Sequence, residues 1–117
     1  MNDSRRPDDL TLLRNTLRTF CAERDWHRYH TPKNLVMALS VEAAELVEHF
    51  QWATPEESQA LAPEKKSEVA DEIADVLIYL IELADVLGID PLAAARAKIK
   101  KNAVKYPPPV PASARTP

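Results

Sequence analysis

The chain has 117 residues, which is enough for one domain with a single core. Its formal net charge is −3, from 15 lysines and arginines against 18 aspartates and glutamates. This charge lacks the basic excess of nucleic-acid-binding proteins, so we expect no nucleic-acid partner. Gly88 is the only glycine against ten prolines, which excludes a Walker-type phosphate loop and a dinucleotide-binding fingerprint, because both need several glycines.

Cysteine usage and hydropathy indicate the compartment. The single cysteine, Cys21, can form neither an internal disulfide nor a cysteine zinc site. The first residues lead into no apolar signal core, and no uncharged run reaches the roughly 18 residues of a membrane span. We therefore expect a cytoplasmic protein with no membrane partner.

The N-terminal third of the chain is expected to contain a flexible segment, one helix and a connector. Residues 1–8 are predicted to be flexible. A helix is predicted over residues 9–23, where five residues form one apolar stripe: Leu10, Leu13, Leu17, Phe20 and Cys21. A polar and aromatic connector follows over residues 24–30. Cys21 is expected to be a buried core thiol.

The second helix is predicted from its start signals. Thr31 is a good N-cap, and Pro32 occupies the first helical position, where its missing N–H costs nothing. The apolar spacing continues to about Trp52. Residues 54–57, Thr-Pro-Glu-Glu, resemble a capping box and predict a short helical turn.

The C-terminal half predicts two more helices and a tail. One helix begins near Pro63 and ends at Gly88, which should let the next helix turn back toward the site. That last helix is capped by Asp90 and continues to about Lys105. The proline-rich tail over residues 107–117 is expected to be extended or disordered. Without a convincing strand pattern, the predicted fold class is all-α.

Two pairs of acidic residues occupy the same position relative to the apolar face of their own helix. Glu42 and Glu45 lie on the second predicted helix, Glu72 and Asp75 on the third, and each pair is spaced i, i+3. At about 100° per residue, each pair starts at the edge of its apolar arc and extends about 60° beyond it. Antiparallel packing would gather four hard oxygen ligands, which suit Mg²⁺ or Mn²⁺. Acidic residues at this spacing are also common on solvated faces, so the geometry alone leaves both interpretations open.

The apolar arcs themselves predict how the helices pack. The arc of the second helix consists of Leu35, Leu39, Ala43, Leu46, Val47 and Phe50, and that of the third of Val69, Ile73, Val76, Leu77, Leu80 and Ala84. Ile78 and Ile81 fall outside the second of these arcs. A helix that is apolar almost all round is usually covered on several sides, which favours a homo-oligomer.

A basic face on the last predicted helix is a candidate phosphate-binding surface. Lys98, Lys101, Asn102 and Lys105 share one face of the last helix and are candidates to bind phosphate, with Tyr106 adding a hydroxyl. A solvated basic face near a helix C-terminus is the alternative.

Aromatic side chains could form a base-binding pocket. Trp26 and Trp52 flank the second helix and could stack on a base, His30 could hydrogen-bond its edge, and Tyr79 could contact the substrate. Hydrophobic packing is the alternative for the tryptophans. His27 and His30 could also suggest a zinc pair, but no further soft ligands accompany them in the sequence, and we set that interpretation aside.

These segments resemble a known family. Residues 34–52, Asn-Leu-Val-Met-Ala-Leu-Ser-Val-Glu-Ala-Ala-Glu-Leu-Val-Glu-His-Phe-Gln-Trp, look like the first metal helix of the MazG-like nucleotide pyrophosphohydrolases, in particular of the dCTP pyrophosphatase branch. Residues 68–80 resemble the second metal helix, residues 98–107 the basic closing helix, and residues 25–34 the preceding segment. We therefore expect one MazG-like domain over residues 9–106.

The resemblance implies a fold and an activity. The fold would be a four-helix bundle-type core completed by homo-oligomerisation into a dimer or tetramer. The activity would be Mg²⁺-dependent hydrolysis of a (deoxy)nucleoside triphosphate, dCTP or a modified dCTP, to the monophosphate and pyrophosphate in nucleotide-pool cleansing, with Mn²⁺ as a substitute metal.

The resemblance also implies roles for single residues. It carries over Glu42, Glu45, Glu72 and Asp75 as catalytic metal ligands, and Glu45 is our candidate to take a proton from the attacking water. Two alternatives remain open: the same reaction on another nucleotide, and a helical interaction module without turnover.

Overall fold

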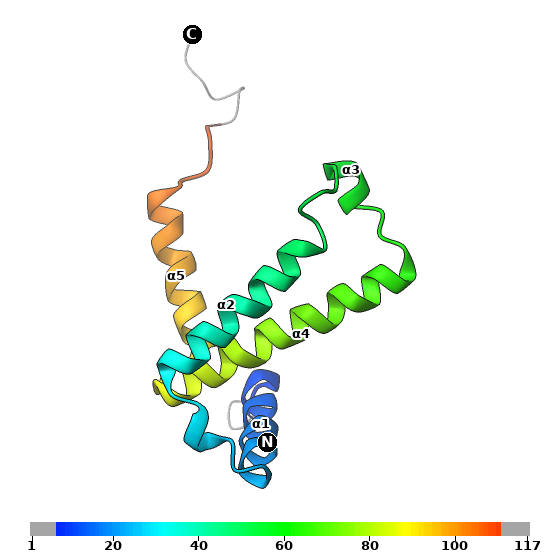
Figure 1. The fold of residues 1–117 in the computed structure, drawn as a ribbon. Helices are drawn as coiled ribbons and strands as arrows, with labels where there is room; N and C mark the ends of the chain where they lie inside the picture. Colours follow the sequence, from blue (N-terminus) through cyan, green and yellow to red (C-terminus); the bar gives the residue numbers. More distant parts are fainter. Residues whose placement is uncertain (1–6, 111–117) are drawn as a thin grey trace.

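The fold is a set of helices without strands over residues 7–110, the part of the chain that the computed structural model describes (Figure 1). The elements in chain order are α1 (Asp9–Glu23), the 3₁₀ turn η2 (His27–Tyr29), α2 (Pro32–Glu48), α3 (Pro55–Ser58), α4 (Pro63–Val86) and α5 (Pro91–Lys105). The predicted all-α class is confirmed. Residues 1–6 and 111–117, most of the two segments predicted to be flexible or extended, lie outside the described residues.

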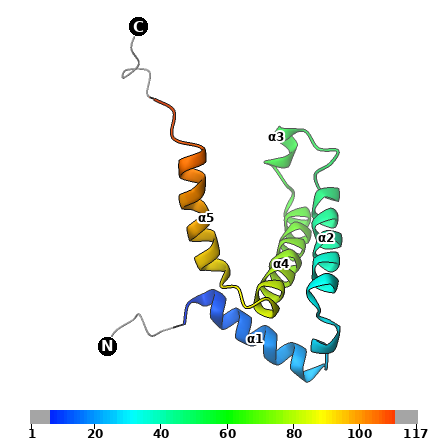
Figure 2. The ribbon, with the colours of Figure 1, turned by 90° about the vertical axis from the view of Figure 1, so that its left-hand side faces the viewer.

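The centre of the fold is an antiparallel pair formed by α2 and α4, which run side by side and are joined through α3 (Figures 1 and 2). Leu35 of α2 and Val69 of α4 are buried along this pair. The antiparallel packing assumed for the two acidic helices is therefore present. None of the helices over residues 7–110 is both long enough and apolar enough to cross a membrane.

Local sequence signals explain where the helices begin. The Thr31 side chain accepts from the Asn34 backbone N–H at 3.2 Å, which caps α2. The predicted capping box starts α3, because Thr54 and Glu57 each accept from the other's backbone N–H, at 3.1 and 3.0 Å. The predicted end of α2 near Trp52 is wrong. The helix ends at Glu48, and residues 49–52 form turns.

Two helices end in the same hydrogen-bonded motif. After α4, Gly88 has φ 68° and its N–H donates to Asp85, while the next residue donates to Ala84 at 2.8 Å. This is a Schellman motif on the predicted glycine. After α1, Asp25 takes the left-handed role with φ 54°, and the Trp26 N–H donates to the Cys21 carbonyl at 3.0 Å. Aspartate tolerates this conformation better than most residues, so the chain turns sharply there without glycine.

The outer helices diverge from the central pair. α1 crosses the pair near the end of α4, and α5 leaves from the same end and runs away from α2 and α4 in both views (Figures 1 and 2). Almost all of α5 is exposed. The expectation that Gly88 turns the last helix back toward the carboxylates is therefore wrong within one chain.

Burial on α4 differs from the predicted arc. Ile81 was placed outside the arc, yet it is 3% exposed, because it faces the place where α1 crosses. Ile73, Leu77 and Leu80 belong to the predicted arc and are about half exposed. These three residues form a stripe at i, i+4 and i+7, which we call the open apolar stripe. One chain thus covers only part of the apolar surface of α4.

Candidate active site

Three carboxylates converge where α2 and α4 pack together. Oxygen atoms of Glu42 and Glu45 from α2 and of Glu72 from α4 all lie within 4.8 Å of one another. We call these three residues the acidic cluster. Asp75 lies almost one helical turn further along α4, and its charge acts on both Glu42 and Glu72. The spacing of i, i+3 on two antiparallel helices is what brings these side chains to one place.

The electrostatics of the acidic cluster show crowding of negative charge. The neighbouring Glu72 carboxyl, followed by burial and by Glu45, raises the pKa of Glu42 to about 7. The interaction with Glu42 lowers the pKa of Glu72, but burial and Glu45 outweigh it, so the pKa of Glu72 is raised overall. The site therefore favours a bound proton or a cation at neutral pH.

The cluster fits a hard divalent cation. Oε2 of Glu42 and Oε2 of Glu72 are both buried and have no hydrogen-bond partner. A buried carboxylate oxygen without a partner is costly, and a cation would satisfy both oxygens at once. The ligands of the acidic cluster are all carboxylate oxygens. Such a set suits Mg²⁺ and Mn²⁺ better than it suits zinc or copper.

A cavity of about 610 Å³ opens beside the acidic cluster. Its size is typical of small-molecule sites, which have roughly 300–1,000 Å³. The lining combines three carboxylates with a group of mainly aromatic and apolar side chains; its members are Thr16, Leu17, Phe20, Trp26, Tyr29, His30, Glu42, Asp75, Ile78, Tyr79 and Glu82. A ligand with an anionic end and a flat apolar end would match this division.

The aromatic part of the cavity is built around Trp26. Its ring makes edge-on contacts with Phe20, at a centroid distance of 5.5 Å, and with His30, at 6.4 Å. Trp26 nevertheless stays about half exposed, because the Schellman turn after α1 holds it at the cavity rather than in a core. Tyr79 lines the same cavity, and burial followed by the charge of Glu42 raises its pKa.

Other predicted site residues stay apart from the acidic cluster within one chain. Trp52 is 89% exposed beyond the end of α2. The candidates for phosphate contacts are all exposed on the diverging α5 or just after it and do not line the cavity; they are Lys98, Lys101, Asn102, Lys105 and Tyr106. Their separation from the carboxylates follows from the direction of α5.

Sequence reasoning missed several cavity residues. Phe20 was assigned to an apolar stripe, Tyr29 to the connector, and Glu82 to no role. Periodicity offers no signal for them, because their convergence depends on how α1 crosses α4. Glu68 and Asp71 form another acidic pair with the i, i+3 spacing on α4, but neither belongs to the acidic cluster. Asp71 is exposed. Oε2 of Glu68 lies 3.8 Å from Nζ of Lys65 and 4.0 Å from Nδ1 of His49.

Comparisons with known proteins give a consistent family assignment. The MazG-like family matches residues 37–110. Proteins named dCTP pyrophosphatase 1 from Bos taurus and Homo sapiens are 42% identical over 90 residues, which cover 75% of this chain and 53% of each relative. The chain thus spans about half the length of these relatives.

A solved structure extends the match to the fold. The crystal structure of a pyrophosphatase from Archaeoglobus fulgidus superposes with a TM-score of 0.82 and 45% sequence identity. The alignment covers 88% of this chain and 96% of the other. The arrangement of helices described above is therefore shared nearly over its full length.

Proposed function

The chain belongs to the MazG-like family, as its sequence motifs predicted, and on that premise we propose that it hydrolyses a nucleoside triphosphate to the monophosphate and pyrophosphate. The observation that carries this proposal is the acidic cluster at one side of an aromatic-lined cavity. The preferred substrate is dCTP or a modified dCTP. This choice rests on the similarity to proteins named dCTP pyrophosphatase 1, and the reaction would serve nucleotide-pool cleansing.

Glu42, Glu45, Glu72 and Asp75 would hold Mg²⁺, for which Mn²⁺ could substitute. When bound there, a divalent cation would supply charge neutralisation for the triphosphate and would help to activate water for attack on the α-phosphorus. The protein supplies the rest of the chemistry. Its carboxylates would hold the cation, since they repel the triphosphate itself, and Glu45 would accept the proton of the attacking water.

The aromatic side chains would bind the base. Trp26 presents a half-exposed ring to the cavity and stacks on the base, while His30 and Tyr79 contact its edge.

Homo-oligomerisation into a dimer or tetramer would complete the site. The open apolar stripe on α4 and the 89% exposed indole of Trp52 are surfaces that a partner subunit would cover. The same assembly would bring the α5 face of one subunit to the acidic cluster of another. Its phosphate-binding residues are Lys98, Lys101, Asn102, Lys105 and Tyr106. We place this assembly in the cytoplasm.

A panel of nucleoside triphosphates tests the proposal. The purified chain is incubated with each nucleotide and Mg²⁺, and the products are resolved. Monophosphate and pyrophosphate from dCTP or a related nucleotide support the proposal. Turnover of a different nucleotide to the same products changes only the substrate. Release of orthophosphate, or no turnover of any nucleotide, would contradict it and favour a helical interaction module.

A further inference from the structure

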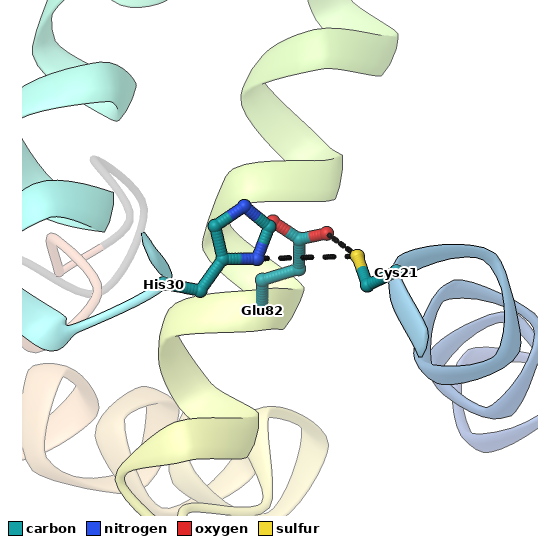
Figure 3. Close-up of side chains that lie close together, drawn as sticks. All are labelled: Cys21, His30 and Glu82. Atoms are coloured by element: carbon teal, nitrogen blue, oxygen red, sulfur yellow. Dashed lines mark hydrogen bonds and ion pairs between the residues drawn. The ribbon is translucent and has the colours of Figure 1, made fainter. Parts of the chain in front are cut away.

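A second group of potential ligands lies where three elements meet. Cys21 of α1, His30 between η2 and α2, and Glu82 of α4 point toward one another (Figure 3). The proposed hydrolysis uses His30 in a contact with the base, but it uses neither Cys21 nor Glu82. The sequence analysis set zinc aside for Cys21 and for His30, because each was considered without the other. Cys21 lies nine positions before His30, and Glu82 joins them only where α1 crosses α4.

The two contacts of Cys21 in this group are hydrogen bonds, and the three polar atoms involved are also close enough together to share one ion. Sγ of Cys21 lies 3.2 Å from Oε1 of Glu82 and 3.9 Å from Nδ1 of His30. Nδ1 of His30 lies 3.7 Å from Oε2 of Glu82, which is too long for a hydrogen bond. With zinc–ligand distances of about 2.0–2.3 Å and tetrahedral angles, ligand atoms lie about 3.4–3.6 Å apart. One of the three observed distances is slightly shorter than this range, and the other two are slightly longer.

Burial gives a second, independent observation. Cys21 is 2% exposed, and the side chains of His30 and Glu82 are 17% and 11% exposed. Oε2 of Glu82 is buried without a hydrogen-bond partner. Its one charged neighbour is Nδ1 of His30 in a long ion pair, and a bound cation would satisfy this oxygen more directly.

There is room for one small ligand beside these atoms. A cavity of about 20 Å³ is lined by all three residues, and a single water needs roughly 10–15 Å³. Arg18 also lines this cavity, but its guanidinium is paired with Asp85, where its Nε donates to a carboxylate oxygen at 2.8 Å. The positive charge of Arg18 is thus already balanced.

We propose that Cys21, His30 and Glu82 bind one Zn²⁺ ion, with water in the fourth position. Sulfur, nitrogen and oxygen ligands together favour zinc, whereas the acidic cluster offers oxygen alone and favours Mg²⁺. The bond formed is zinc–thiolate, and the thiol proton passes to solvent. The ion would join three elements that line the larger cavity.

Cobalt binding tests the proposal, because Co²⁺ bonded to a thiolate gives a near-ultraviolet charge-transfer band and strong visible bands when tetrahedral. The reduced, metal-free full chain is titrated with Co²⁺ in excess Mg²⁺, which occupies the acidic cluster. We expect one equivalent to produce both bands, and Zn²⁺ to abolish them.

Matched variants locate the ligands. We expect Cys21→Ala to abolish the charge-transfer band and Glu82→Gln to weaken Co²⁺ binding at least tenfold. His27→Gln is the control, because His27 lies near His30 in the chain but outside the group. It should bind Co²⁺ like the unaltered chain. Circular dichroism checks that each variant is folded.

The decisive outcome does not depend on any variant. Absence of a thiolate band in the unaltered chain overturns the proposal, as does a band of equal strength in folded Cys21→Ala. Glu42→Gln should keep the band even though it damages the acidic cluster. Failure of the zinc site is therefore distinguishable from failure of the proposed hydrolysis, which is read from nucleotide products instead.

Discussion

Glu42→Gln should make the chain more stable than the unaltered chain without metal, and less stable than the unaltered chain when Mg²⁺ is bound. Without metal, the raised pKa of about 7, against an ordinary 4.5, means that the folded state holds a proton which the unfolded state releases between these pH values. Stability therefore falls as pH rises from about 4.5 to about 7. At about 1.4 kcal/mol per pH unit, this lowers the free energy of unfolding by at most roughly 3 kcal/mol. Screening at a partly exposed carboxylate reduces this cost to about 1 kcal/mol.

The variant removes this cost but also removes a metal ligand. In a chelator at pH 8, Glu42→Gln should therefore be more stable by about 1 kcal/mol, which raises the melting temperature by roughly 4 °C. At pH 4.5 the difference should vanish. In Mg²⁺ at 100 times its dissociation constant, the unaltered chain should gain about 2.7 kcal/mol and the variant much less.

Thermal unfolding by circular dichroism under these three conditions measures the reversal. Glu48→Gln is the matched control, because Glu48 is exposed on the same helix and lies outside the acidic cluster. It should change little in any condition. The reasoning is refuted if Glu42→Gln is less stable than the unaltered chain in chelator at pH 8, or if Mg²⁺ stabilises both equally.

Three further predictions follow from single side chains. Leu35→Ala should lower the free energy of unfolding by about 2–5 kcal/mol in a urea titration, because Leu35 is 1% exposed; a loss below about 0.5 kcal/mol would argue against its place in the core. Trp26→Ala should raise KM more for the preferred nucleotide than for poor ones, and an equal rise across a panel would mean that Trp26 only packs. Asp85→Asn should lower the melting temperature at pH 7, and the difference should shrink as pH falls below 3.8, because Arg18 lowers the pKa of Asp85 and the stabilisation is lost as pH falls through that lowered value; a difference independent of pH would contradict this.

Local signals in the sequence predicted the helices well. Caps such as Thr31, Thr54 and Asp90 act within four residues of where they stand, so they define helix starts without knowledge of the fold. Gly88 is similar, because a left-handed residue after a helix is a local requirement. The end of α2 was harder, since residues 49–52 keep apolar character while their backbone turns.

Features that depend on how helices cross were not predictable from spacing. Ile81 is buried because α1 crosses α4 there, although it lies outside the apolar arc. The direction of α5 follows from the turn around Gly88 and cannot be derived from periodicity. The acidic cluster was partly predictable, because Glu42, Glu45 and Glu72 have matching phases on their helices, whereas the antiparallel packing that brings them together had to be assumed.

The most direct test of the proposed activity is the hydrolysis of dCTP with Mg²⁺ in ¹⁸O-labelled water, with mass analysis of the products. Attack on the α-phosphorus predicts labelled dCMP and unlabelled pyrophosphate. Glu42→Gln should abolish this turnover and Glu48→Gln should retain it. Label in pyrophosphate, release of orthophosphate, or full activity of Glu42→Gln would contradict the account.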